Sequence, residues 1–168
     1  MKLSKITAVG LVLLLSASAA FAQGGWGSLS ALKGQRKVNV AFDYSESIIQ
    51  GRTEEKWASE EPNWGLAQEE VAAKFVEEFN ERVASTSSPI LVGEFPDAYY
   101  TILIKPSNIV RQGNFSGRVY LMDGNGNIVM DVPLQAKGGH IGSFWNLLGD
   151  GMRDAAKTIA YKYRDIVK

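Results

Sequence analysis

The 168-residue chain contains no cysteine and a single histidine, His140. The missing thiols exclude a disulfide framework, a thiolate metal site and a lipid-accepting cysteine. A nucleophilic triad needs a base. The single histidine has no acidic residue at a spacing typical of a catalytic motif, so it is a weak candidate for that role. We therefore predict no catalytic residue, no metal site and no cofactor.

The charged residues are balanced. Lysine plus arginine and aspartate plus glutamate each number 18, so the formal net charge is zero. A nucleic-acid-binding protein concentrates basic side chains on one face to displace counterions, and this balance argues against such a partner. After the first 22 residues, no apolar run approaches the roughly twenty residues that span a bilayer as a helix. The sequence therefore predicts no integral membrane segment in the remaining chain.

The first 22 residues, MKLSKITAVGLVLLLSASAAFA, have the three parts of a secretory signal peptide. Lys2 and Lys5 make a basic start, residues 6–15 form an apolar stretch too short for a membrane anchor, and a small-x-small motif ends at Ala22. We predict cleavage after Ala22, so that the mature chain begins at Gln23 and is periplasmic or secreted. It is not expected to be a lipoprotein, because Gln23 stands where a lipid-accepting cysteine would be needed.

The rest of the chain divides into a lead-in and one domain. Residues 23–35 are rich in glycine and serine, which predicts a flexible lead-in that could be held to the domain by Trp26 or by Leu29 and Leu32. A single α+β domain is expected over 36–168, a length that can bury its own core. Apolar residues at every second position predict its strands, and apolar residues spaced three or four apart predict its helices. The predicted strands cover 38–44, 98–105, 115–122 and 128–137, with a short edge strand in 89–95, and the predicted helices cover 66–85 and 143–168.

This order predicts a two-layer α+β sandwich with the connectivity β-α-β-β-β-α. The first helix crosses right-handedly between two parallel strands, and a hairpin around the turn at 123–127 continues a mixed sheet of about four strands. Two helices would cover one face of the sheet. The other face is expected to be open and to carry polar side chains dotted with tyrosine: Asn39, Asp43, Thr101, Lys105, Arg118, Tyr120, Asp131, Gln135 and Lys137.

The pattern from Arg36 to Lys168 resembles small envelope modules of bacteria. The strand KVNVAFDYSE, a helix, the strand YYTILIK, the hairpin RVYLMDGNGNIV and a closing helix carry the resemblance. Similar modules include the amino-terminal domain of the Tol-Pal propeller protein, outer-membrane lipoproteins that activate peptidoglycan synthases, and exported families with no assigned function. The resemblance implies a domain that binds other envelope proteins and has no catalytic residues. Gln23 departs from the lipoprotein members, which have cysteine at that position.

The segment 45–65 is the first candidate site. It breaks the strand pattern with charges and two tryptophans, and we expect a long loop there. Trp57 and Trp64 could contact a partner or stack on a sugar ring, with Glu60 and Glu61 beside them. The acidic residues could also form the carboxylate pair of a glycosidase, but loop carboxylates near lysine and arginine are usually solvated charges.

A second candidate is the stretch KGGHIGSFWNLLGDGM at 137–152. Ser143 would cap the last helix, and free N–H groups at a helix start can hold an anion. The stretch has neither the Lys-Ser/Thr end of a phosphate loop nor the glycine spacing of a dinucleotide site. We favour a sharp corner between strand and helix, with an anion site at His140, Gly142 and Ser143 as the alternative. The glycines inside the helix predict a kink or tight packing.

The turn at 123–127, DGNGN, offers oxygen atoms at alternate positions, as calcium loops do. An EF-hand would require glycine where Ile128 stands and glutamate where Leu134 stands. Glycine and asparagine are also the residues that a tight hairpin turn needs for positive φ. We therefore favour a plain turn over a calcium site.

These observations predict an exported, non-enzymatic interaction or assembly module whose partner is another envelope protein or a second copy of itself. Arg118 and Tyr120 on the open face are candidate contacts, as are Trp57 and Trp64 in the segment 45–65. The alternative is a small-ligand or glycan-binding protein that uses the same tryptophans.

The cleavage site can be tested directly. Ala20→Arg places a large charged side chain three residues before the predicted scissile bond, where a small residue is needed. We expect uncleaved precursor to accumulate in this variant, whereas the unaltered chain and a Gln23→Ala control yield a mature protein that begins at position 23. Intact mass and N-terminal sequencing of the exported fraction measure this, and a mature chain with another first residue would contradict the prediction.

Overall fold

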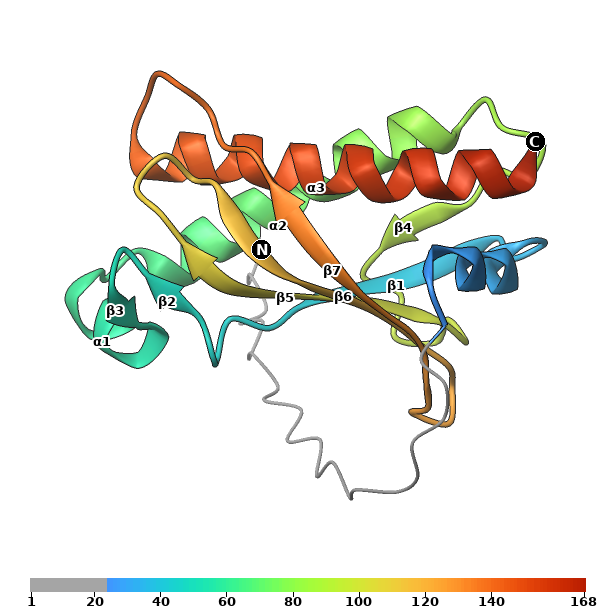
Figure 1. The fold of residues 1–168 in the computed structure, drawn as a ribbon, viewed down its shortest axis with the longest axis horizontal. Coiled ribbons are helices and arrows are strands. Elements are labelled where there is room, and N and C mark those ends of the chain that lie inside the picture. The colour runs from blue at the N-terminus through green and yellow to red at the C-terminus, as the bar shows by residue number, and fades with distance from the viewer. Residues whose placement is uncertain (1–23) are drawn as a thin grey trace, which may run out of the picture.

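The computed structural model describes residues 24–168, so the predicted signal peptide and Gln23 lie outside the described residues. Helices and a mixed sheet confirm the α+β class, and Figure 1 shows two long helices side by side on one face of the sheet. The elements are η1 Trp26–Leu32, β1 Lys37–Phe42, β2 Ile48–Ile49, β3 Arg52–Thr53, α1 Glu54–Glu60, α2 Trp64–Val83, β4 Leu91–Gly93, β5 Thr101–Ile109, β6 Phe115–Met122, β7 Ile128–Ala136 and α3 Phe144–Val167.

Strand β5 is central to the sheet. Its first half pairs in parallel with β1, its last two residues pair in parallel with β2, and β6 pairs with it in the antiparallel sense. Beyond these, β4 lies parallel to β1, while β7 and β3 lie antiparallel to β6 and β2. The predicted parallel pairing across the first helix and the predicted antiparallel hairpin are both confirmed.

The prediction of about four strands was wrong, because the sheet has seven. The additional strands include β2 and β3, which fall in the segment 45–65 that we expected to be a long loop. Each has two residues, too few to show a period in the sequence. Their turn has positive φ at Gln50 (50°) and Gly51 (82°), which is typical of a tight hairpin. The same segment contains α1 and the beginning of α2.

Part of the lead-in expected at 23–35 has regular structure. Residues 26–32 form the short 3-10 helix η1, which packs against α3 and β7. Leu29 and Leu32 are fully buried. A 3-10 helix has three residues per turn, so leucines three apart point to the same side and enter the core together. This spacing is too short a pattern to distinguish from chance in the sequence.

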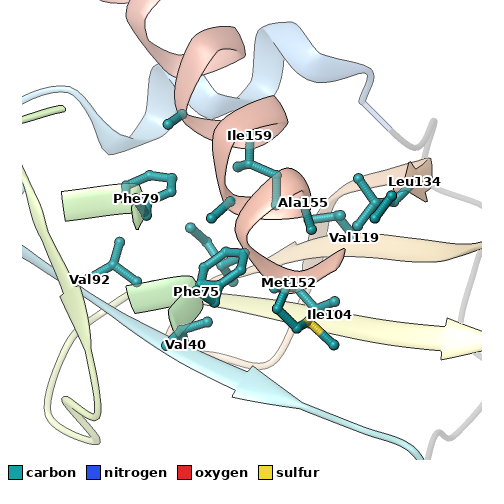
Figure 2. Close-up of a cluster of buried hydrophobic side chains, with 14 of the residues drawn as sticks. Val40, Phe75, Phe79, Val92, Ile104, Val119, Leu134, Met152, Ala155 and Ile159 are labelled. Atoms are coloured by element: carbon teal, nitrogen blue, oxygen red, sulfur yellow. The ribbon is translucent and has the colours of Figure 1, made fainter. Parts of the chain in front are cut away.

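The hydrophobic core lies between the sheet and the two long helices. Buried residues alternate along the strands and recur every three or four positions along the helices, as the sequence periods predict. Each large side chain that is fully buried contributes about 1.5–3 kcal/mol. Figure 2 shows α2, α3 and the strands contributing to the cluster, with Phe75, Phe79, Met152, Ala155 and Ile159 on the helices and Val40, Val92, Ile104, Val119 and Leu134 on the strands.

Helix α3 packs closely on the connection between β5 and β6, where two glycines meet. A Cβ atom on Gly151 would lie 2.4 Å from the carbonyl oxygen of Gly113. Gly113 itself has φ of 75°, and a Cβ there would lie 2.2 Å from the carbonyl of Leu147. Of the two predicted roles for the glycines in α3, tight packing is therefore the one found at Gly151.

At two edge strands of the sheet, hydrogen bonds within the chain and a proline obstruct pairing with a further strand. At β4, the Asn80 side chain donates from Nδ2 to the Val92 carbonyl (2.9 Å) and accepts the Val92 N–H at Oδ1 (2.8 Å). At β7, the Asp131 N–H donates to the Gly24 carbonyl (3.4 Å), and Pro133 has no N–H to offer. Both arrangements reduce the chance that another chain adds a strand at these edges.

The role of Asn80 can be measured. We expect Asn80→Ala to lower the free energy of unfolding by about 1–2 kcal/mol, because both backbone groups of Val92 lose their partner. The higher helix propensity of alanine offsets part of this loss. Denaturant unfolding followed by circular dichroism gives the value, and Glu81→Ala, an exposed neighbour on α2, is the control at about 0.5 kcal/mol or less. Equal stability of the two variants would contradict this role for Asn80.

Candidate functional site

The face of the sheet turned away from α2 and α3 is the candidate site, and we call it the open face. The strand register aligns Ala41, Leu103, Tyr120 and Asp131 in one row across four strands. All four are partly buried rather than fully exposed. Since successive side chains of a strand point to opposite faces, the neighbouring row on the core side consists of the buried Val40, Ile102, Leu121 and Met130.

One rim of the open face holds an ion-pair network around Lys105. Its ammonium lies 3.0 Å from the Asp43 carboxylate and 3.3 Å from that of Glu46. Burial alone would raise the pKa of Asp43, but hydrogen bonds from Ser45 and the charge of Lys105 hold it below its ordinary value. Burial would likewise lower the pKa of Lys105, yet the two carboxylates raise it. Lys105 and Asp43 are therefore both charged at neutral pH, and the charge of Lys105 is compensated within the chain.

Arg118 and Tyr120, both predicted contacts, lie together on the open face. The Arg118 guanidinium is paired through Nε with the Asp131 carboxylate, which lies directly opposite Tyr120 on β7. The hydrogen bond to Asp131 is the main reason why the pKa of Arg118 is raised. Only 8% of the Asp131 side chain is exposed, against 45% of Arg118. Asp131 thus fixes the position of a guanidinium that still faces solvent.

Trp57 and Trp64 do not form an exposed surface. They are 4% and 3% exposed and belong to an aromatic cluster that we define as Tyr44, Trp57, Trp64, Phe144 and Trp145. The Trp57 ring lies 5.2 Å from Phe144, and the Trp64 ring lies 5.2 Å from Tyr44 and 5.8 Å from Trp145. The geometry therefore removes both tryptophans as stacking platforms for a glycan and places them in the core, where aromatic pairs stabilise the fold.

The acidic residues around α1 have structural partners. Glu60 lies 2.8 Å from Lys56 and 3.0 Å from Arg52, and the hydrogen bond from Lys56 and the charges of both basic residues lower its pKa. The Trp64 indole N–H donates to Glu54 over 2.7 Å. Glu61 lies at the end of α1 and is partly buried. These contacts hold α1 against the aromatic cluster, which supports the interpretation of the acids as structural charges.

The stretch before α3 is a corner that ends in a cap. The Ser143 hydroxyl accepts the backbone N–H of Asn146 at 3.4 Å, so it is used by the first turn of α3. Gly142 has φ of 133°, in the region that favours glycine. His140 is exposed on the connecting bend. The arrangement supports the corner over the anion site.

The hairpin turn uses both oxygens of its only carboxylate. Oδ1 of Asp123 accepts the backbone N–H groups of Asn125 and Asn127, and Oδ2 accepts the Asn127 side chain, all at 2.9 Å. These hydrogen bonds also hold the pKa of Asp123 below its ordinary value. Asp123 thus stabilises a plain turn, and residues 24–168 contain no cluster of three or more acidic, histidine or cysteine side chains suited to a metal ion.

A shallow depression lies where α2 and α3 end. It has a volume of about 190 Å³ and is lined by Ser85, Thr86, Ser87, Arg164, Val167 and Lys168. This is below the roughly 300–1,000 Å³ of small-molecule sites. The carbonyl ends of both helices point toward this end of the molecule and disfavour an anion there. Within residues 24–168, no helix combines the length and apolar character that crossing a bilayer requires.

Two features of the site escaped the sequence analysis. The aromatic cluster joins the segment 45–65 to Phe144 and Trp145, about eighty residues later, and no local signal marks such a contact. The apolar centre of the open face, Ala41 and Leu103, was detectable in principle, because both alternate with buried residues of their strands.

Comparisons with known proteins leave the family open. No family model matches the chain, and no curated protein matches it. A solved structure that matches is a substituted form of PelC from Paraburkholderia phytofirmans, described as a dodecamer, with 16% sequence identity and a TM-score of 0.38. The match covers 79% of this chain and 90% of that chain. The likeness is too low to support an argument, and the resemblance to envelope modules stays a prediction.

The burial of the tryptophans has a measurable consequence. We expect Trp64→Ala to lower the free energy of unfolding by about 3–5 kcal/mol, because it removes a large side chain from a packed cluster. Leu66→Ala, two residues after Trp64 at a site of α2 that is 62% exposed, is expected to change it by about 0.5 kcal/mol or less. Urea unfolding at neutral pH compares the two. Wild-type stability of Trp64→Ala would show that this ring is not part of the core.

Proposed function

We propose that this protein is an exported, non-enzymatic interaction or assembly module whose open face docks onto another envelope protein. The observation that carries the proposal is the row through Leu103 and Tyr120, which is partly apolar and has neither long helix over it. Export rests on the signal-peptide pattern of residues 1–22. The class of partner follows from export, because an exported chain meets other envelope proteins.

The open face combines residue types that dominate protein interfaces. Tyrosine and arginine are enriched among the residues whose truncation costs most binding free energy. Tyr120 supplies a ring and a hydroxyl, and Arg118 is already oriented by Asp131. A side chain that is held in place before binding loses less conformational entropy when the complex forms.

The chemistry of the open face defines the partner that would fit it. The exposed edge of the Arg118 guanidinium suits a carboxylate, and the adjacent Leu103 and Tyr120 suit apolar side chains around that carboxylate. At the rim, Lys105 is neutralised by Asp43 and Glu46. We therefore expect binding that depends on shape and on a few contacts, of which the Arg118 contact is the one weakened by salt.

The other sequence candidates are less suitable for docking. Trp57 and Trp64 are buried, and the strand edges at β4 and β7 are obstructed by Asn80 and Pro133. A partner is therefore expected to bind the face of the sheet rather than extend it by strand addition.

Cross-linking in the intact envelope, followed by affinity capture and mass spectrometry, tests the proposal. We expect Tyr120→Ala to reduce recovery of the partner at least about ten-fold, since loss of a central interface residue costs about 2 kcal/mol. Tyr161→Ala is the matched control, because this tyrosine is 39% exposed on α3, on the other side of the molecule. Both variants must first show the circular dichroism spectrum of the unaltered protein.

The recovered protein is then purified and titrated against the unaltered chain and both variants by calorimetry. Equal binding by Tyr120→Ala and the unaltered chain would place the interface elsewhere. If the unaltered chain captured no envelope protein and bound none in titration, the interaction module itself would be refuted.

A further inference from the structure

The outer surface of the helical layer carries two stripes of opposite charge. On α2, Glu70, Glu77 and Glu81 are exposed and fall on one side of the helix, and we call them the acidic stripe. On α3, spacings of four, seven and four residues align the basic stripe on one side: Arg153, Lys157, Arg164 and Lys168.

The two helices run in parallel and in register, which sets the stripes side by side. At their beginning the rings of Trp64 and Trp145 lie 5.8 Å apart. Toward their end Arg82 donates a hydrogen bond to the Tyr161 hydroxyl over 2.7 Å. Figure 1 shows the same arrangement, with α2 and α3 running together along the sheet.

Charges within one chain satisfy these stripes only in part: Arg153 lies 3.4 Å from Asp150, and Lys168 lies 2.6 Å from Asp165. The ion pair that joins the two stripes within residues 24–168 is Glu77 with Arg153, at 3.9 Å, and these side chains remain 73% and 44% exposed. The other four stripe residues, Glu70, Glu81, Lys157 and Arg164, have no ion-pair partner within 4 Å among the described residues. The stripes therefore keep most of their charge available to a second molecule.

We propose that the helical layer is a self-association surface on which a second copy of this chain binds with its acidic stripe against the basic stripe of the first. Two copies that meet face to face are related by a two-fold axis lying in the interface. If the axis runs parallel to the helices, α2 of each copy faces α3 of the other. If it runs across them, α2 faces α2 and like charges meet, which disfavours that dimer.

With the axis parallel to the helices, each residue has the same position along the helix direction in both copies. Residues of α2 and α3 that lie at the same level within one copy therefore also face each other between copies. Glu77 then meets Arg153 of the second copy, and Glu81 meets Lys157 one turn further on. Leu66, 62% exposed at the beginning of α2, meets the beginning of α3, where Trp145 is partly buried. Each contact occurs twice by symmetry.

The size of the surface predicts a weak dimer. Two helices about 30 Å long, with axes about 9 Å apart, offer a contact area of roughly 600 Å² per copy. This is below the roughly 800 Å² that each partner buries in a standard interface. Attraction between exposed charges is screened by salt. The inference goes beyond the proposed function, because it uses the opposite layer of the molecule and does not depend on the open face.

Sedimentation equilibrium of the protein purified after export tests the proposal. We expect a monomer–dimer equilibrium at about 10 mM salt, where the screening length is roughly 30 Å, and at least ten-fold weaker association at about 1 M salt, where it is roughly 3 Å. Glu77→Lys with Glu81→Lys makes both stripes basic, and Arg153→Glu with Lys157→Glu makes both acidic. Each double variant is expected to be monomeric alone, and an equal mixture of the two is expected to form heterodimers.

A matched control separates stripe pairing from net charge. Lys33→Glu with Lys162→Glu changes the net charge as much as Arg153→Glu with Lys157→Glu, but both lysines are exposed outside the basic stripe, so dimerisation should persist. A monomeric unaltered chain at low salt would overturn the proposal, and so would double variants that dimerise alone or fail to combine. None of these results would bear on capture of a partner by the open face.

Discussion

The pairing of β5 along its length constrains the rest of the molecule. Because β1 joins β5 in parallel, the chain between them must cross over one face of the sheet, and α2 is the helix that does so. Because β6 and β7 follow as antiparallel strands, the chain returns at the end from which α3 runs alongside α2 in the same direction. The parallel helix pair, the buried core and the open face all follow from this pairing.

Two surfaces of different chemistry result. On the open face the charges are paired within the chain, and partly buried Leu103 and Tyr120 lie among them. On the helical layer the acidic stripe of α2 and the basic stripe of α3 lie side by side and are largely exposed. The first arrangement favours recognition through shape and fixed contacts, and the second favours association through charge.

The aromatic cluster explains why the most conspicuous residues of the sequence are not at a surface. The indole N–H of Trp57 and the hydroxyl of Tyr44 are buried without a hydrogen-bond partner in the described part of the chain. Burial also raises the pKa of the Tyr44 hydroxyl. A buried polar group without a partner costs about 1–3 kcal/mol, so ring packing and the contacts of Glu54 and Glu60 must hold this end of the molecule together.

The sequence by itself determined the class of fold, the two long helices, the four longer strands and the hairpin. These elements extend over six or more residues, so the spacing of their apolar residues shows which side of each element faces the core. Arg118 and Tyr120 were placed on one face for the same reason.

Only the tertiary structure decided the strands β2 and β3, the packing of η1, and the burial of Trp57 and Trp64. The two short strands exist because β5 continues to Ile109 and offers backbone partners there. The tryptophans are buried because the beginning of α3 returns beside α2. Contacts between segments about eighty residues apart leave no periodic trace in either segment, and that is the physical reason why the sequence alone did not reveal them.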